Sequence, residues 1–321
     1  MSLLTPAVLV VLGLDLLVLA VLASALPTAV RAAFRWEFPA ATARQLALEK
    51  RAELAASAVA FALAFKLPAL GLVLAAFDAL AARVPGAMCA VGVLQAAPHG
   101  WLGLGLRVVD VLLLGLWWSA HRRDLASTGW EHSQRKFGLF LVLFGGLVLE
   151  AAASLASFGG LATDRIVSCC GTLFDTATAG LGALLAGMPA APLLAGLGGL
   201  LGLMAAAAWR RWPTVFGLAS LVFLPLALVA LVAVFSPYVY ELPHHRCPFC
   251  LLQLDYGAIG YLLYGLLLYA SGRGLAAVFT RRVLGEPPPG SLWWPWAAAA
   301  GFVLLAGLYP AVYRLRTGCW L

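Results

Sequence analysis

The chain has 321 residues, of which 63% are hydrophobic and only 11% are charged. Soluble globular domains usually carry about 25% charged residues, so the composition excludes a soluble enzyme or binding module. The net charge of +7 is accounted for by basic loops that lie beside anionic lipid head groups. We therefore expect membrane lipid as a partner and no nucleic acid.

The hydropathy pattern predicts an all-α, polytopic integral membrane helix bundle. A spanning helix requires about 20 mostly apolar residues, and the chain contains eight such runs. We expect a single integral membrane domain over residues 1–321, because no extramembrane segment is long enough to fold alone. The eight predicted helices are Ala7–Val30, Glu53–Ala82, Trp101–Ala120, Phe137–Phe158, Ala190–Trp209, Val215–Ser236, Cys250–Ser271 and Trp293–Tyr313.

Most of the 21 Lys and Arg residues follow the first, third, fifth and seventh predicted helices, Lys136 among them, whereas Arg107 is counted with the opposite face. Cytoplasmic loops are enriched in basic residues. Both termini are therefore expected to be extracytoplasmic. The short loops and the lack of a targeting segment favour a bacterial inner membrane.

Five charged residues inside predicted helices are candidates for buried interactions. Each would cost about 2.5–3.5 kcal/mol at the bilayer centre, so they are expected to face the bundle interior or a wet cavity. Two roles for these charges stay open: a proton path, or a buried ion pair that fixes helix register. Lys66 and Glu150 lie at similar depth and are candidates to pair. The five are Asp15, Lys66, Asp78, Asp110 and Glu150.

All six cysteines fall in, or at the edge of, loop segments that the basic-residue pattern places on the extracytoplasmic face. Such clustering points to redox, metal or disulfide chemistry on the extracytoplasmic face. In the stretch between Cys170 and Cys247, Gly198 and Gly202 have the small-xxx-small spacing that permits close helix approach. The cysteines are Cys89, Cys169, Cys170, Cys247, Cys250 and Cys319.

Residues 243–250 read Pro-His-His-Arg-Cys-Pro-Phe-Cys. Proline is favoured at the first helical position, so Pro248 predicts that the seventh helix begins here. The positive end of that helix would stabilise a thiolate at Cys247, and Cys250 would resolve the mixed disulfide. Asp255, about two turns deeper, is the expected acceptor for the proton of the resolving thiol.

The Cys-Pro-Phe-Cys sequence resembles the active-site dithiols of glutaredoxins and periplasmic disulfide oxidases. Within a helical membrane bundle it also resembles the membrane disulfide-generating enzymes of the DsbB and vitamin K epoxide reductase families. This resemblance implies thiol–disulfide electron transfer by Cys247 and Cys250 with a periplasmic thiol protein, and a quinone as cofactor. It also implies a relay or disulfide pair drawn from Cys89, Cys169, Cys170 and Cys319.

Two alternatives stay open. His244, His245, Cys247 and Cys250 offer imidazole and thiolate ligands that suit copper or zinc, as in a metal carrier or a metallocentre-assembly protein. The other alternative is a noncatalytic membrane subunit of a respiratory or transport complex with structural disulfides. Whether the protein is an enzyme is therefore open. No haem is expected, because no histidine lies within a predicted span and no Cys-X-X-Cys-His motif occurs.

Overall fold

The computed structural model describes residues 4–37, 42–127, 131–164, 166–167, 181–288 and 290–321. Every regular element within these ranges is a helix. Eight helical segments in them are long and apolar enough to cross a membrane, which confirms the predicted number and indicates an integral membrane protein. They are Pro6–Arg35, Ala43–Arg83, Gly100–Ala126, Ser133–Gly159, Ala190–Trp209, Pro213–Tyr240, Ile259–Leu284 and Trp293–Thr317.

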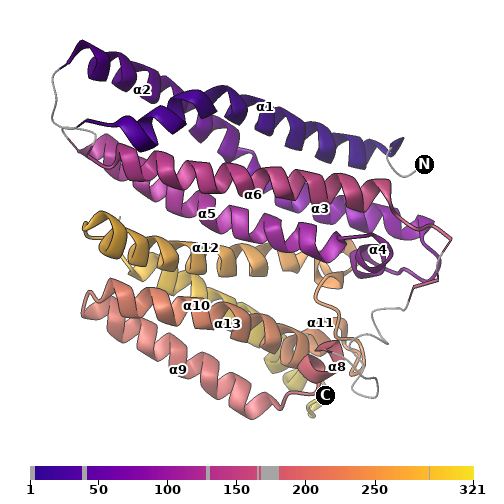
Figure 1. Ribbon diagram of the computed structural model, residues 1–321. Helices are drawn as coiled ribbons and strands as arrows, with labels where there is room; N and C mark the ends of the chain where they lie inside the picture. The colour runs from indigo at the N-terminus through magenta and orange to yellow at the C-terminus, as the bar shows by residue number, and fades with distance from the viewer. Residues whose placement is uncertain (1–3, 38–41, 128–130, 165, 168–180, 289) are drawn as a thin grey trace. The chain divides into compact units, whose positions relative to one another are not determined.

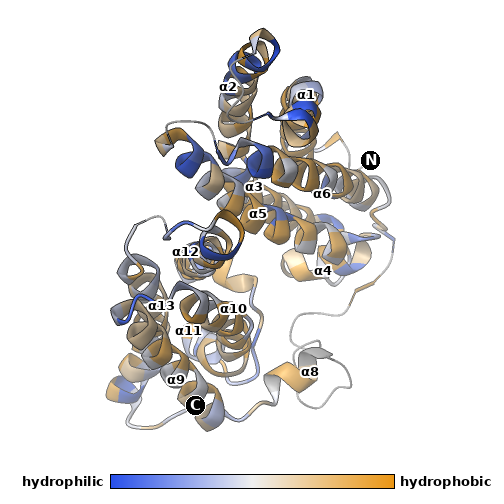
Figure 2. Cartoon of the chain, turned by 60° about the vertical axis from the view of Figure 1, so that its left-hand side comes forward, coloured by the Kyte–Doolittle hydropathy of each residue, from blue (hydrophilic) through white to orange (hydrophobic). Residues whose placement is uncertain are grey.

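Large apolar side chains cover the outer faces of these helices. Leu16 and Leu54 are 70% and 73% exposed, and Val142 and Leu149 are exposed as well. Figure 2 shows hydrophobic colour along much of the helices, with hydrophilic colour concentrated in helix ends and connections. Such apolar faces suit the hydrocarbon core of a bilayer, where every backbone polar group must be satisfied within a helix.

Contacts divide the chain into two compact units. Unit 1 contains residues 1–80 and 93–163, and unit 2 contains residues 81–92 and 164–321. The segment 81–92 lies between the two stretches of unit 1 in the sequence but packs with unit 2. The single domain expected from the sequence stays a prediction.

Unit 1 is a bundle in which α6 packs against both α1 and α5, while α1 also contacts α2 and α3 (Figure 1). Thr42 caps the start of α2, because its hydroxyl accepts a hydrogen bond from the Gln45 backbone N–H at 3.2 Å. Buried aromatic residues such as Phe137 and Phe140 fill the centre. The helices are α1 (Pro6–Arg35), α2 (Ala43–Ala64), α3 (Lys66–Leu80), α5 (Gly100–Ala126) and α6 (Ser133–Gly159).

Unit 2 is built on four long helices that contact one another in a ring: α9 packs on α10, α10 on α12, α12 on α13, and α13 on α9. Phe223 and Phe302 meet edge to face inside it. These helices are α9 (Ala190–Trp209), α10 (Pro213–Ala230), α12 (Ile259–Phe279) and α13 (Trp293–Thr317). Shorter elements are η2 (Ala81–Arg83), α8 (Leu181–Ala186), η3 (Leu231–Phe235), α11 (Ser236–Tyr240), η4 (Cys250–Leu252), η5 (Leu254–Tyr256) and η6 (Thr280–Leu284). Another short helix, α4 (Ala90–Ala96), begins within the segment 81–92.

The close helix approach expected at Gly198 and Gly202 occurs elsewhere. A Cβ atom added at either residue would meet nothing within 4 Å. The close contact lies instead between α10 and α12, where a Cβ on Gly217 would be 2.5 Å from the Gly274 carbonyl oxygen. The glycines that allow close helix packing in unit 2, Gly217 and Gly274, thus lie outside the glycine-rich run of the sequence.

Candidate functional site

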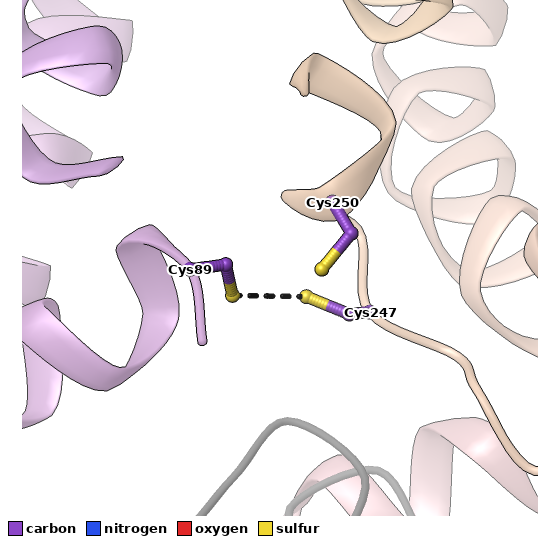
Figure 3. A group of neighbouring side chains, drawn as sticks. All are labelled: Cys89, Cys247 and Cys250. Atoms are coloured by element: carbon purple, nitrogen blue, oxygen red, sulfur yellow. Dashed lines mark hydrogen bonds between the residues drawn. The ribbon is translucent and has the colours of Figure 1, made fainter. Parts of the chain in front are cut away.

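Three cysteines of unit 2 converge on one point, which we call the cysteine cluster: Cys89, Cys247 and Cys250. Cys89 directly precedes α4, and the other two lie in and just after the loop that follows α11. Their Sγ atoms all lie within 4.8 Å of one another (Figure 3). The Sγ atoms of Cys89 and Cys247 are 3.6 Å apart although the residues are 158 positions apart in sequence. All three side chains are buried, with 0%, 0% and 4% exposure.

Two tyrosines hold the backbone of the Cys-Pro-Phe-Cys loop. The Tyr240 hydroxyl, at the end of α11, donates a hydrogen bond to the Cys247 carbonyl oxygen. The Tyr264 hydroxyl, in α12, donates to the Pro248 carbonyl oxygen at 2.6 Å. Tyr240 of α11 precedes the loop in sequence and Tyr264 of α12 follows it, so the loop backbone is held from both sides, which pre-organises the positions of its thiols.

The segment after the loop is tied down as well. The Gln253 side-chain amide donates to the Met88 carbonyl oxygen at 3.3 Å, one residue before Cys89. A Cβ on Gly260 would be 2.9 Å from the Leu251 carbonyl carbon, so only glycine lets the first turn of α12 pack directly on η4. These contacts connect both cysteine-bearing segments within unit 2.

The seventh helix does not begin at the Cys-Pro-Phe-Cys sequence, as the position of Pro248 had predicted. α12 starts at Ile259, and the intervening residues form two separate single turns, η4 and η5. The N-terminus of α12 is therefore not at Cys247, as the predicted stabilisation of its thiolate required. Asp255 lies in the second of these turns and is exposed, so it is not the buried carboxylate expected beneath the dithiol.

The two histidines of the loop differ in their surroundings. His244 is exposed, whereas His245 is half-buried. The Nε2 atom of His245 is buried and has no hydrogen-bond partner in the described part of the chain. Its ring packs against Tyr240 with 4.4 Å between centroids. Burial lowers the pKa of His245, and the negative charge of a Cys89 thiolate opposes that shift.

Of the remaining predicted relay cysteines, Cys319 lies apart from the cysteine cluster. Cys319 is exposed in the C-terminal tail, with its Sγ 3.5 Å from the Thr317 hydroxyl. Cys169 and Cys170 lie outside the described residues. Of the four cysteines proposed as a relay, the structure thus brings Cys89 to Cys247 and Cys250.

A second buried group, the charge cluster, lies in unit 1 and consists of Asp15, Lys66, Arg107, Asp110 and Glu150. Lys66 pairs with Glu150 at 2.6 Å and with Asp15 at 3.2 Å. Arg107 pairs with Asp15 and, at 2.7 Å, with Glu150.

Sequence reasoning missed Arg107, although its place three residues before Asp110 inside a predicted span was a usable signal. The remaining charged residue expected within a span, Asp78, is partly exposed on α3.

Three convergent sulfurs can support two kinds of chemistry. They can hold a soft metal ion as thiolates, or they can exchange disulfide partners. No protein-family model, curated protein or solved structure matches the chain significantly.

Proposed function

We propose that the cysteine cluster binds one thiophilic metal ion, Cu(I) or Zn(II), and that the protein is a metal-binding membrane protein of the carrier or metallocentre-assembly kind. The convergence of Cys89 with Cys247 and Cys250 supports this proposal. Sulfurs bonded to one ion at about 2.3 Å lie roughly 4 Å apart, and the Cys89 and Cys247 Sγ atoms are 3.6 Å apart.

Burial of the three thiols favours metal binding over exchange with an outside protein. A thiol that attacks a partner's disulfide needs access to it, and Cys247 is 0% exposed. A bound ion, in contrast, gains from a dry shell with ligands held in place. The hydrogen bonds from Tyr240 and Tyr264 to the loop carbonyls are contacts of that kind.

The two metals make different demands on the cluster. Cu(I) accepts three thiolate ligands, whereas zinc sites in proteins are almost always tetrahedral. For zinc, His245 has a buried Nε2 atom without a hydrogen-bond partner in the residues described, but its ring would have to move toward the sulfurs to serve as a fourth ligand, because its nitrogens do not lie within 4.8 Å of all three. We place the site on the extracytoplasmic face of a bacterial inner membrane, following the distribution of basic residues.

Metal binding by the full-length protein, purified anaerobically in detergent, tests the proposal. After addition of Cu(I) or Zn(II) and removal of the excess, we expect about one ion per chain by elemental analysis. Replacing a ligand should weaken binding about tenfold or more, judged by the losses that even supporting residues cause. The substitutions are Cys89→Ser, Cys247→Ser and Cys250→Ser.

Cys319→Ser is the matched control, because the same substitution falls on an exposed cysteine outside the cluster. It should retain full binding. His245→Ala should weaken zinc but not Cu(I) binding if the imidazole is the fourth ligand. Full binding by Cys89→Ser would contradict the proposal, since Cys89 is what distinguishes the cluster from an isolated dithiol.

Thiol–disulfide exchange is the second candidate, favoured by the 3.6 Å contact between the Cys89 and Cys247 sulfurs. A Cys89 thiolate attacking a Cys247–Cys250 disulfide would form a Cys89–Cys247 disulfide and release Cys250 as thiolate. This internal step leaves the number of electrons unchanged. Net turnover would require a protein dithiol on the outer face and an electron acceptor such as a quinone.

Differential alkylation of the cysteines in intact cells, read by mass spectrometry, separates the two candidates. Metal binding predicts that the cluster is reduced but protected until a membrane-impermeant chelator is added. Exchange predicts a mixture of oxidation states at Cys247 and Cys250 that a chelator leaves unchanged. Fully and stably oxidised cysteines, together with partner proteins that always co-purify, would instead support a noncatalytic subunit with structural disulfides.

A further inference from the structure

The charge cluster of unit 1 carries one more acidic than basic group. Three carboxyl groups, Asp15, Asp110 and Glu150, face two cations, Lys66 and Arg107. All five side chains are at most 5% exposed, and they lie in helices apolar enough to span a membrane. With every group ionised, the cluster would hold a surplus negative charge away from water.

The two cations are engaged mainly with two of the three carboxyl groups. Arg107 donates hydrogen bonds to both carboxylate oxygens of Asp15 and to the Ser154 hydroxyl. Lys66 donates to Asp15 and to Oε1 of Glu150, and Arg107 also approaches Oε1. The charges of Asp15 and Glu150 are therefore balanced by Lys66 and Arg107, and Asp110 supplies the surplus negative charge.

Two carboxylate oxygens remain without a donor. Oδ2 of Asp110 and Oε2 of Glu150 are buried and have no hydrogen-bond partner among the described residues. The two side chains lie within hydrogen-bonding reach of each other. Gly146, one turn before Glu150 on α6, makes room for this arrangement, because a Cβ there would collide with the Asp110 carboxylate.

We infer that Asp110 and Glu150 share one exchangeable proton, which makes the centre of unit 1 a proton-binding site. A single proton shared by the two carboxyl groups would supply a missing donor and remove the surplus charge. Two carboxylates in one site cannot both be ionised without strong repulsion. The other charged groups that face the pair are Asp15 from α1, Lys66 from the start of α3, and Arg107 from α5.

The ligand is a proton rather than a metal cation. Hard cations in proteins are held by about six or more oxygen ligands, whereas the pair presents two acceptor oxygens beside two fixed positive charges. Membrane-embedded acids of this kind serve in proton relays of pumps and transporters. The site is independent of the cysteine cluster, which belongs to unit 2.

Infrared difference spectroscopy of the full-length protein in lipid nanodiscs tests the inference. At neutral pH we expect a carbonyl stretching band from a buried carboxylic acid that shifts in D2O. The band should be lost in Asp110→Asn, because Asp15 and Glu150 are then balanced by Lys66 and Arg107. Asp78→Asn, on a partly exposed aspartate of α3, should leave the band unchanged.

Three results would overturn the inference: no such band in the wild-type protein, a band that survives in Asp110→Asn, or a wild-type band that appears only after sodium and potassium are withdrawn. The last would show that an alkali cation normally occupies the site. Should Asp110→Asn fail to fold by circular dichroism, Glu150→Gln serves instead. It leaves Asp15 and Asp110 against two cations and should lose the band as well.

Discussion

Some basic residues that look like membrane-flanking charges in the sequence are buried in the structure. Lys136, counted with the cytoplasmic loops, is 0% exposed and pairs with the Asp124 carboxylate. The same carboxylate accepts hydrogen bonds from the His132 backbone N–H at 3.1 Å and from the Ser133 hydroxyl at 2.6 Å, at the start of α6. Counting Lys and Arg by position predicts orientation, but it does not tell which of them are solvated.

Arg107 provides a prediction at the residue scale. Arg107→Leu should lower the free energy of unfolding by roughly 3–5 kcal/mol, because it leaves three buried carboxyl groups facing one cation. Arg107→Lys should fall between the wild type and the leucine variant, because an ammonium group cannot reproduce the bidentate contact with Asp15. Unfolding by denaturant in detergent micelles, followed by circular dichroism, gives the order.

Arg51→Leu is the control, since Arg51 is exposed on α2. It should change the free energy of unfolding by less than about 1 kcal/mol, as most surface substitutions do. Equal stability of Arg107→Leu and the wild type would mean that the ion pairs of Arg107 contribute nothing net to the fold.

At the scale of elements, the start of α12 shows what local reading could and could not predict. Pro248 is a valid helix-start signal, yet Gly257 and Ala258 both adopt left-handed backbone conformations, with φ of 67° and 51°. That pair of residues interrupts the chain, so the regular helix begins only at Ile259. A glycine seven residues after Cys250 was visible in the sequence, but the left-handed alanine was not.

Helix packing gives a second prediction, between α10 and α12. A methyl group added at Gly274 would overlap the Ser220 hydroxyl and lie 2.8 Å from its Cβ. Gly274→Ala should therefore push the helices apart and destabilise unit 2 by roughly 1–3 kcal/mol, the usual cost of overpacking. Thermal unfolding in detergent, monitored by circular dichroism, measures the loss.

Gly202→Ala is the matched control within the same unit, because a Cβ there would meet nothing within 4 Å. Alanine is the better helix former, so this variant should be at least as stable as the wild type. If Gly202→Ala were the more damaging of the two, the glycine-rich run of α9 would have to contact a second molecule.

At the scale of the whole molecule, the sequence predicted the helical architecture much better than the site. Apolar runs determine membrane-spanning helices locally, and the span Ala190–Trp209 was predicted at both of its bounds. The approach of Cys89 to Cys247 is a contact over 158 positions, which depends on the segment 81–92 packing with unit 2. No local pattern carries that information, so Cys89 could be named as a candidate but not assigned to the cluster.

The side of the membrane on which the ends lie is a prediction that Cys319 can test. It is exposed beyond the end of α13, and the basic-residue pattern places it outside. A membrane-impermeant maleimide applied to intact cells should label Cys319 and leave Cys89, Cys247 and Cys250 unlabelled, because those three are buried. Peptide-resolved mass spectrometry distinguishes the four thiols within one sample.

A cysteine introduced by Ser291→Cys is the control for sidedness. Ser291 is exposed in the connection between α12 and α13, which the same pattern places in the cytoplasm, so it should react only after the membrane is permeabilised. Eight crossings require both termini to lie on one face, and labelling at Cys319 therefore also fixes the N-terminal side. The reverse outcome, with Ser291→Cys labelled in intact cells and Cys319 protected, would place the cysteine cluster at the cytoplasmic face. A metal site there would take its ion from cytoplasmic rather than extracytoplasmic donors.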